Sequence, residues 1–427
     1  MKTSLLLRIF LTLTIAFGFL SSKAQQDNWT HFRGSNLNGI STESKAPTVW
    51  NDTTNIMWKT DIEGKGWSSP VVYGNQIWVT TATDNGKKML GVCLDINSGK
   101  KIFTLDLFHP DSVFSKHAMN SYATPTCAVE EGFVYIHFGS YGTACVNTAT
   151  GATVWKRTDL KCEHAQGPGA SPIIYKDLLI LNYEGTDVQF LIALDKKTGK
   201  TVWRTERSAE FNKPLDAIGR KAYITPIILN VKGVDLLISN GSAVCNAYEA
   251  STGKEVWHIV KGLDSTVAMP FEENGTIYFY TSFLLPSAAD RYIELLSVNP
   301  DGKGDIAKTN VNWTIKSPAF QLSTPVIKDG LIYTIDASNA LACLDAKTGK
   351  ELYTKKLKSK YHSSPILANG NVYFTSAKGE TLVIKQGKDL QVVAENKLPG
   401  EVYATPAFVR NSIIFRNEKS VYRIVTK

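Results

Sequence analysis

One sequence unit recurs along most of this chain, and its repetition limits the possible folds more than any other feature. The unit is clearest at residues 324–357, TPVIKDGLIYTIDASNALACLDAKTGKELYTKKL. It opens with Thr-Pro, continues through short runs that alternate apolar and polar residues, and turns at Asp-Gly and at Thr-Gly-Lys. Short alternating runs bounded by such turns are typical of antiparallel strands. Each copy therefore predicts a small sheet of four antiparallel strands.

The openers of the unit give the number of copies. A sheet of four short strands cannot bury both faces alone, and repeated sheets of this kind stack radially as the blades of a β-propeller. Eight openers therefore predict eight blades. The openers are Ser69-Pro70, Thr124-Pro125, Ser171-Pro172, Thr225-Pro226, Met269-Pro270, Thr324-Pro325, Ser364-Pro365 and Thr405-Pro406.

The last copy is incomplete, and this indicates how the ring closes. After its opener the sequence has two further strand patterns, at residues 412–416 and 420–425, and no outer strand. A spare strand pattern at residues 55–62 precedes the first opener, with Trp58 at the position where other copies carry an aromatic residue. We therefore predict an all-β fold, an eight-bladed β-propeller of four-stranded antiparallel blades. An N-terminal strand is expected to close the ring by completing the last blade.

The N-terminal residues do not belong to the repeats. Lys2 precedes an apolar run over residues 5–20, and small residues then lead to Ala24. A basic start, an apolar centre and a small-residue exit are typical of a secretory signal peptide. We predict a signal peptide at 1–24, cleaved near Ala24, an N-terminal extension at 25–54 and the propeller at 55–427. A periplasmic or secreted protein is expected, with a retained membrane anchor as the alternative.

Charge and cysteine content restrict the function. Removal of residues 1–24 takes away three cations and no acid, so the formal charge falls from +8 to +5. This mild excess does not predict a nucleic-acid partner. Three of the six cysteines, Cys93, Cys145 and Cys343, occupy a small apolar position of the third strand, which predicts buried thiols. A disulfide among the other three stays open, and no cysteine or histidine pair has the spacing of a zinc site, so we predict no metal ligands.

The repeat resembles that of the PQQ-like β-propeller family. The resemblance rests on an apolar strand followed by an acid, a Thr-Gly-Lys turn and an aromatic residue, as in IALDKKTGKTVW (192–203) and CLDAKTGKELY (343–353). It covers residues 55–427. The segment at 28–36, NWTHFRGSN, is similar to an N-terminal element of exported bacterial members. A repeat of this kind specifies a fold and leaves the function open, because one scaffold carries several functions.

Two branches of that family are relevant to function. One contains quinone-dependent sugar and alcohol dehydrogenases, which hold pyrroloquinoline quinone (PQQ) and calcium at the channel mouth. The other contains non-catalytic propellers similar to BamB, and this chain resembles the second branch in length. The adjacent Cys-Cys pair of the dehydrogenases has no counterpart in the sequence. The resemblance therefore implies no resident cofactor, with PQQ and calcium as the alternative.

One position of the repeat predicts a ligand site. The third residue before each proline ends the loop that leads into the inner strand, so these residues should surround the mouth of the central channel. Flat, half-polar side chains at such a mouth suit stacking with a ligand. The alternative is that they simply fill the channel. The predicted ligand-binding residues are Trp67, Tyr122, Tyr223, His362 and Tyr403.

Long connections are expected to bring further polar groups to the same mouth. Residues 108–122, 161–169 and 207–223 link outer strands to inner strands, and an insertion at 283–291 emerges on the same face. Histidine suits acid–base work near neutral pH, and arginine binds carboxylates through paired hydrogen bonds. These loops supply the candidate catalytic residues of a carbohydrate-active enzyme, of the polysaccharide lyase or glycosidase type. The candidates are His117, His164, Tyr122, Tyr223 and Arg220.

No complete catalytic set is evident in the sequence, and this decides the leading hypothesis. We expect an exported, monomeric binding or scaffold module that engages a protein or a glycan at its loop-rich face. The carbohydrate-active enzyme and the quinone-dependent dehydrogenase are the alternatives.

Overall fold

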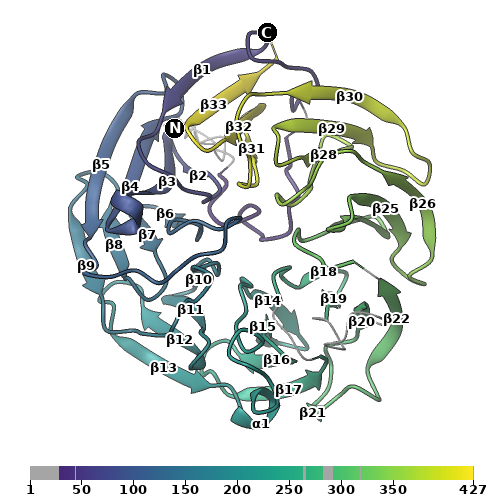
Figure 1. Cartoon of the computed structure of the whole chain (residues 1–427). Helices are drawn as coiled ribbons and strands as arrows, with labels where there is room; N and C mark the ends of the chain where they lie inside the picture. Colours follow the sequence, from purple (N-terminus) through teal and green to yellow (C-terminus); the bar gives the residue numbers. More distant parts are fainter. Residues whose placement is uncertain (1–27, 44, 263–265, 282–291, 318, 427) are drawn as a thin grey trace, which may run out of the picture.

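The computed structural model is a ring of eight β-sheets around a central channel (Figure 1). It describes residues 28–426 apart from 44, 263–265, 282–291 and 318. The predicted signal peptide and the 283–291 insertion thus lie outside the described residues. Within the described residues, no helix is long and apolar enough to cross a membrane. The prediction of an eight-bladed, all-β propeller is confirmed.

In seven blades the four main strands follow sequence order from the channel to the rim, and in the last blade β1 takes the outer position. The inner strands are β2 (Val71–Tyr73), β6 (Ala128–Glu130), β10 (Ile173–Tyr175), β14 (Ile227–Val231), β18 (Phe271–Glu273), β23 (Val326–Lys328), β27 (Ile366–Ala368) and β31 (Ala407–Val409). The second strands are β3 (Gln76–Thr83), β7 (Phe133–His137), β11 (Leu178–Glu184), β15 (Val234–Asn240), β19 (Thr276–Tyr280), β24 (Leu331–Ile335), β28 (Asn371–Thr375) and β32 (Ser412–Arg416).

The outer half of each blade completes the sheet. The third strands are β4 (Lys88–Asp95), β8 (Thr143–Asn147), β12 (Gln189–Asp195), β16 (Val244–Glu249), β20 (Ile293–Val298), β25 (Ala340–Asp345), β29 (Glu380–Lys385) and β33 (Ser420–Val425). The outer strands are β5 (Lys101–Phe108), β9 (Thr153–Arg157), β13 (Thr201–Glu206), β17 (Glu255–Val260), β22 (Val311–Ser317), β26 (Glu351–Lys356), β30 (Val392–Lys397) and β1 (Ile56–Asp61). A two-residue strand, β21 (Gly304–Asp305), adds in parallel to β17, and two short helices, η1 (Asp84–Gly86) and α1 (Ala209–Asn212), lie in connections.

The N-terminal strand closes the ring, as predicted. Strand β1 pairs antiparallel with β33, so the last blade contains both ends of the propeller. Asp61 lies opposite Ser420, and the Ser420 hydroxyl donates to the Asp61 carboxylate at 2.6 Å. Figure 1 shows β1 at the rim beside β33.

In four blades a tryptophan of the outer strand donates its indole N–H to the next blade. The Trp155 indole Nε1 donates to the carbonyl of Lys196 in the next blade, at 3.0 Å. Its ring lies against the Thr-Gly-Lys turn of that blade, where a Cβ on Gly199 would come within 2.7 Å of the indole. Gly199 also has φ of +71°, which glycine adopts without strain. The Thr-Gly-Lys turn thus both closes a hairpin and packs against the neighbouring blade.

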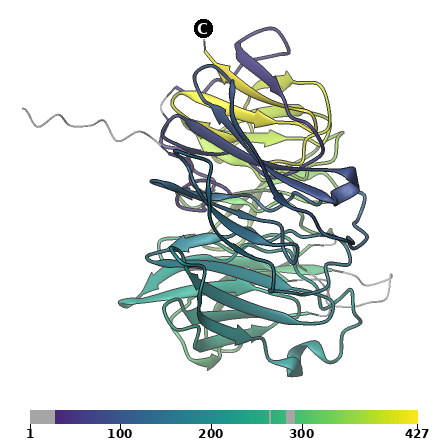
Figure 2. The same cartoon turned by 90° about the vertical axis from the view of Figure 1, so that its left-hand side faces the viewer.

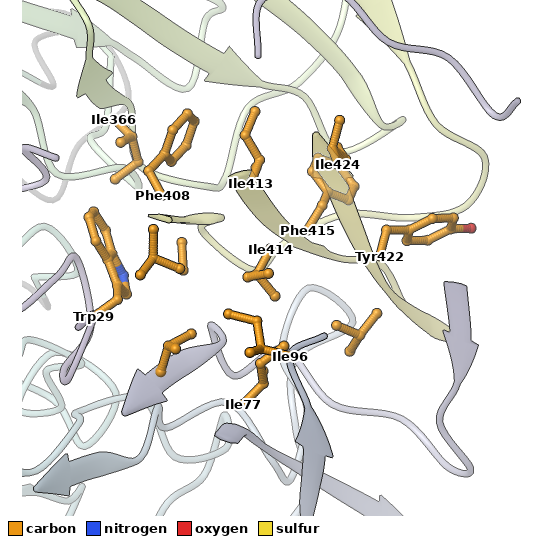
Figure 3. Close-up of a cluster of buried hydrophobic side chains, with 14 of the residues drawn as sticks. Trp29, Ile77, Ile96, Ile366, Phe408, Ile413, Ile414, Phe415, Tyr422 and Ile424 are labelled. Atoms are coloured by element: carbon orange, nitrogen blue, oxygen red, sulfur yellow. The ribbon is translucent and has the colours of Figure 1, made fainter. Parts of the chain in front are cut away.

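The hydrophobic core lies between the blades. Figure 3 shows one cluster in which Ile366 of β27 and Phe408 of β31 meet Ile77 of β3 and Trp29 of the N-terminal segment. Side chains from blades at both ends of the chain therefore share one apolar interface. All six cysteines are buried and free of disulfides, including the three predicted to act as small apolar residues.

Candidate functional site

A segment at the N-terminus, residues 28–43, lies across one end of the channel, and we call it the plug. The Trp29 amide donates to the Val72 carbonyl at 2.9 Å, and the Ser41 amide donates to the Leu367 carbonyl at 2.8 Å. In Figure 1 the purple segment passes the centre of the ring beside β2 and β31. Figure 2 shows α1 and η1 on one side of the ring, with purple N-terminal segments toward the other. The plug therefore lies at the end of the channel away from the long connections.

Arg33 fixes the plug to the wall of the channel. Its guanidinium is fully buried and donates to the carbonyls of Thr324 at 2.5 Å and Pro325 at 2.6 Å. A third bond reaches the Asn38 carbonyl within the plug at 3.0 Å. Burial lowers the pKa of Arg33 to about 9, so the side chain stays charged at neutral pH.

Between the plug and the long connections the channel contains a cavity of about 470 Å³. Phe32 of the plug forms the end of the cavity away from the loops. Each blade contributes two residues that are two positions apart, just before its inner strand, and these make two rings. The rim ring, nearer the loops, consists of Trp67, Thr124, Gly169, Tyr223, Val267, Leu322, His362 and Tyr403. The hydroxyl ring below it consists of Ser69, Thr126, Ser171, Thr225, Met269, Thr324, Ser364 and Thr405.

The hydroxyl ring connects neighbouring blades by hydrogen bonds. In seven of the eight steps around the ring, the backbone N–H of one member donates to the hydroxyl of the next at 2.9 to 3.0 Å. The step from Thr225 to Met269 has no such bond, because methionine has no hydroxyl. The Ser/Thr of each opener therefore has a structural reason for its chemistry. The sequence pattern identifies these residues as strand openers, and it contains no local signal that they line the cavity.

The blade formed by β6 to β9, which we call blade two, departs from the predicted register by two residues. Thr126 occupies the hydroxyl ring, so Cys127 takes the place that proline has in other blades. The Thr124-Pro125 pair that resembles an opener precedes it, and Thr124 donates to the Asn120 side chain at 2.5 Å.

The predicted place of Tyr122 in the rim ring is consequently wrong, and Thr124 is found there instead. Tyr122 packs edge-on against Tyr141 and donates its hydroxyl to the Phe114 carbonyl at 3.0 Å. The remaining four predicted ligand-binding residues, Trp67, Tyr223, His362 and Tyr403, line the cavity.

Three of those residues form a continuous aromatic wall. The ring centroids of Trp67 and Tyr403 lie 4.5 Å apart, and those of Tyr403 and His362 lie 4.8 Å apart with nearly parallel planes. Burial, aided by the positive charge of Lys360, lowers the pKa of His362 to about 4, so the imidazole is neutral at pH 7. Across the cavity, the Tyr223 hydroxyl donates to the Gln166 side chain at 2.5 Å. The wall thus offers flat, uncharged surfaces.

Comparison with known proteins identifies the family of this propeller. The family model described as "Outer membrane protein assembly factor BamB" matches residues 40–158, 142–280 and 244–393. The chain belongs to this PQQ-like propeller family. No curated protein matches the chain.

Solved structures share the propeller fold at low sequence identity. BamB from Moraxella catarrhalis is 13% identical with a TM-score of 0.53, over 81% of this chain and 98% of that one. The computationally designed Ika8 protein is 10% identical with a TM-score of 0.56, over 91% of this chain and 99% of that one. A quinohemoprotein alcohol dehydrogenase from Comamonas testosteroni is 11% identical with a TM-score of 0.48, over 94% and 80%.

The structure separates the candidate catalytic residues of this PQQ-like propeller. His117 lies exposed at the rim of the cavity, where its Nδ1 accepts from the Met119 amide at 3.2 Å. His164 is buried, with its Nδ1 3.0 Å from the Lys221 amine, and burial together with that charge lowers its pKa well below the ordinary value. The side chain of Arg220 donates to the Leu215 carbonyl at 3.1 Å, and Arg220 is not among the described lining residues. Of the five candidates, His117 and Tyr223 line the cavity, while His164, Arg220 and Tyr122 do not.

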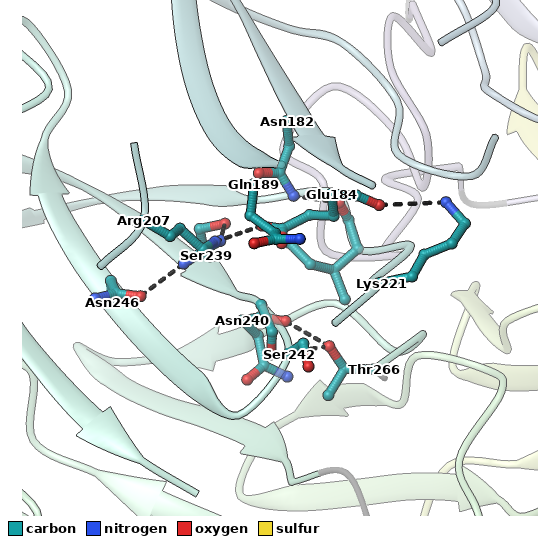
Figure 4. A network of polar contacts seen from close by, with 12 residues as sticks. Asn182, Glu184, Gln189, Arg207, Lys221, Ser239, Asn240, Ser242, Asn246 and Thr266 are labelled. Atoms are coloured by element: carbon teal, nitrogen blue, oxygen red, sulfur yellow. Dashed lines mark hydrogen bonds and ion pairs between the residues drawn. The ribbon is translucent and has the colours of Figure 1, made fainter. Parts of the chain in front are cut away.

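A buried polar network explains the position of the 207–223 connection (Figure 4). Arg207 and Glu184 form an ion pair whose side chains are 0% and 1% exposed. Arg207 also donates to the Asn246 side chain at 2.6 Å and to the Ser239 hydroxyl at 2.5 Å, and Lys221 donates to the Glu184 backbone carbonyl at 3.3 Å. These bonds join the blades that contain β11 and β15. The network therefore fixes the 207–223 connection, with Arg207 and Lys221, against these two blades.

The donors of this cavity do not match the calcium of the dehydrogenase branch. Calcium binds six to eight oxygen ligands, several of them carboxylates. The described residues that line the cavity include no Asp or Glu. Among all the residues that the structure describes, no group of three or more His, Cys, Asp or Glu is placed so that it could hold a metal ion. A glycosidase also requires a pair of carboxyl groups at the scissile bond, and this lining does not contain one.

Proposed function

We propose that this propeller is a non-catalytic binding module that engages a protein partner through the loop-rich mouth of its channel. The observation that carries the proposal is the cavity itself. Its described lining consists of aromatic, aliphatic, hydroxyl and amide side chains and two histidines, of which His362 is neutral at pH 7, and it contains no Asp, Glu, Lys or Arg. A lining of that kind suits binding by shape and hydrogen bonds, and its described residues include no carboxylate to serve as a catalytic acid or base.

The family supports a protein as the partner. Its model is described as an assembly factor for outer-membrane proteins, and BamB is among the chains that share the fold. We extend this to a periplasmic site of action, which the predicted signal peptide at 1–24 also favours. A neutral glycan is the second candidate, because the aromatic wall of Trp67, Tyr403 and His362 suits stacking with a sugar ring.

Photo-crosslinking in the native cell tests the proposal. A photoreactive residue replaces Met119, which lies at the rim of the cavity and is 39% exposed. The matched control replaces Val202 on the outer strand β13, which is 53% exposed and remote from the channel. We expect crosslinks to exported proteins from position 119 and not from position 202. Equal crosslinking at the two positions, or none at position 119, would refute a protein partner at this mouth.

A further inference from the structure

The hydroxyl ring leaves seven hydrogen-bond donors without a protein acceptor. Each of its seven hydroxyl oxygens accepts a backbone N–H from the neighbouring blade, and none donates to a described protein group. All seven residues are between 2% and 4% exposed, and all line the cavity. Trp67 lines the same cavity, and its indole N–H is buried without a partner among the described residues. We call the part of the channel at the hydroxyl ring and Trp67 the waist. It therefore presents O–H and N–H hydrogen-bond donors.

Three buried cations lie directly behind this lining. Arg33 bonds to the carbonyl of Thr324, a member of the hydroxyl ring. Arg416 donates to the Ser68 carbonyl at 2.9 Å, beside Trp67 and Ser69.

The third cation, Lys221, lies behind the opposite part of the rim. Its amine is 4.5 Å from the centroid of the Tyr223 ring. Burial lowers the pKa of Lys221 to about 8 and that of Arg416 to about 9, so both side chains are charged at neutral pH.

These cations have no acidic side chain as a hydrogen-bond partner among the described residues. Arg33 and Arg416 donate to backbone carbonyls and to the Ser68 hydroxyl, and Lys221 contacts the Glu184 backbone carbonyl and the His164 imidazole. Glu184 itself is paired with Arg207. The described residues that line the cavity include no acid to oppose the positive potential of the three cations, which therefore extends into it.

We infer that the waist of the channel binds the carboxylate of an acidic ligand. Hydrogen bonds to an ionised acceptor are about twice as strong as bonds between neutral groups, and several of these donors surround one small space. The three cations lie behind the lining residues. From there their charge favours one carboxylate in the cavity, without direct contact with it. The inference rests on the proposed function, because it assigns a chemical class to the group that enters the same cavity.

A carboxylate can come from a protein or from an acidic sugar, and two matched pairs of probes separate these sources. One pair is N-acetylphenylalanine and its primary amide, and the other is glucuronate and glucose. Each member is titrated into the purified mature protein at constant ionic strength, with binding followed by calorimetry. We expect the acid of at least one pair to bind about tenfold or more tightly than its uncharged partner.

Variants then locate the site. Thr324→Val and Ser364→Ala each remove one ring hydroxyl, and Thr153→Val removes an exposed threonine of β9 as the control. The preference for the acid should fall in the ring variants and persist in the control. The acid–amide comparison in the unmodified protein needs no variant, so poor folding of a variant does not decide the outcome.

The inference is wrong if acid and uncharged partner bind equally, or if none of the four probes binds. A negative result of this kind, together with crosslinks from position 119, would reject the carboxylate site and leave the binding function standing. Loss of both results would reject the proposed function as well.

Discussion

Replacement of Gly199 by alanine tests whether the Thr-Gly-Lys turn holds neighbouring blades together. The alanine methyl would lie 2.7 Å from the Trp155 ring and would also adopt φ of +71°. A left-handed backbone costs a non-glycine residue about 1–2 kcal/mol, and overpacking a buried contact costs about 1–3 kcal/mol more. Gly199→Ala should therefore lower the free energy of unfolding by about 2–5 kcal/mol.

Gly330 provides the matched control. Its φ is +74°, and a Cβ there would have no atom within 4 Å. Gly330→Ala should cost only the backbone part, about 1–2 kcal/mol. Urea unfolding followed by tryptophan fluorescence measures both variants.

The difference between the two variants is the packing contribution of the indole. A second variant, Trp155→Leu, should recover part of the loss in a double-mutant cycle with Gly199→Ala. Equal destabilisation of the Gly199 and Gly330 variants, or full additivity in the cycle, would refute the inter-blade role of this turn.

Two further predictions concern buried ionisable groups. Burial lowers the pKa of His31 from 6.5 to about 4, so the unfolded chain takes up a proton at a higher pH than the folded one. Unfolding should therefore become easier as the pH falls from 6.5 to 4, by about 3 kcal/mol for this residue, and His31→Gln should flatten that dependence in urea titrations. An unchanged pH dependence in the variant would contradict the assignment. Glu184→Gln leaves Arg207 buried without its counter-charge and should cost about 3–5 kcal/mol. Glu206→Gln breaks an exposed pair with Arg204 and should cost less than about 1 kcal/mol, and similar melting temperatures for the two variants would refute the importance of burial.

The repeat in the sequence predicted the blades and their closure because both depend on local patterns. A strand alternation, a turn glycine and an aromatic four residues later define one blade, and a spare strand with Trp58 completes the last. The register of blade two could not be read in this way. Thr124-Pro125 has the residue types of an opener. The register is decided by the hydrogen bond from the Ser69 amide to the Thr126 hydroxyl, and this bond joins two different blades.

The site was less predictable because its long loops fold in ways that local sequence does not determine. His164 and His117 come from similar polar loops, yet one is buried beside Lys221 and the other lies exposed at the rim. The same limit applies to Arg33, whose partners Thr324 and Pro325 are about 290 residues away in sequence. The hydroxyl ring was present in the openers, but its donors become a site only when the blades close around the channel.

The sharing of the last blade between β1 and β33 has a consequence for how the protein folds. The closing contact between Asp61 and Ser420 spans 359 residues, so it cannot form until nearly the whole chain has been synthesised. Contacts of such long sequence separation slow folding, and until closure β1 has no partner strand and can pair with a strand of another molecule. A folding chain would therefore be most vulnerable to aggregation while β1 waits for β33. Pairing of β33 with β1 ends this exposure.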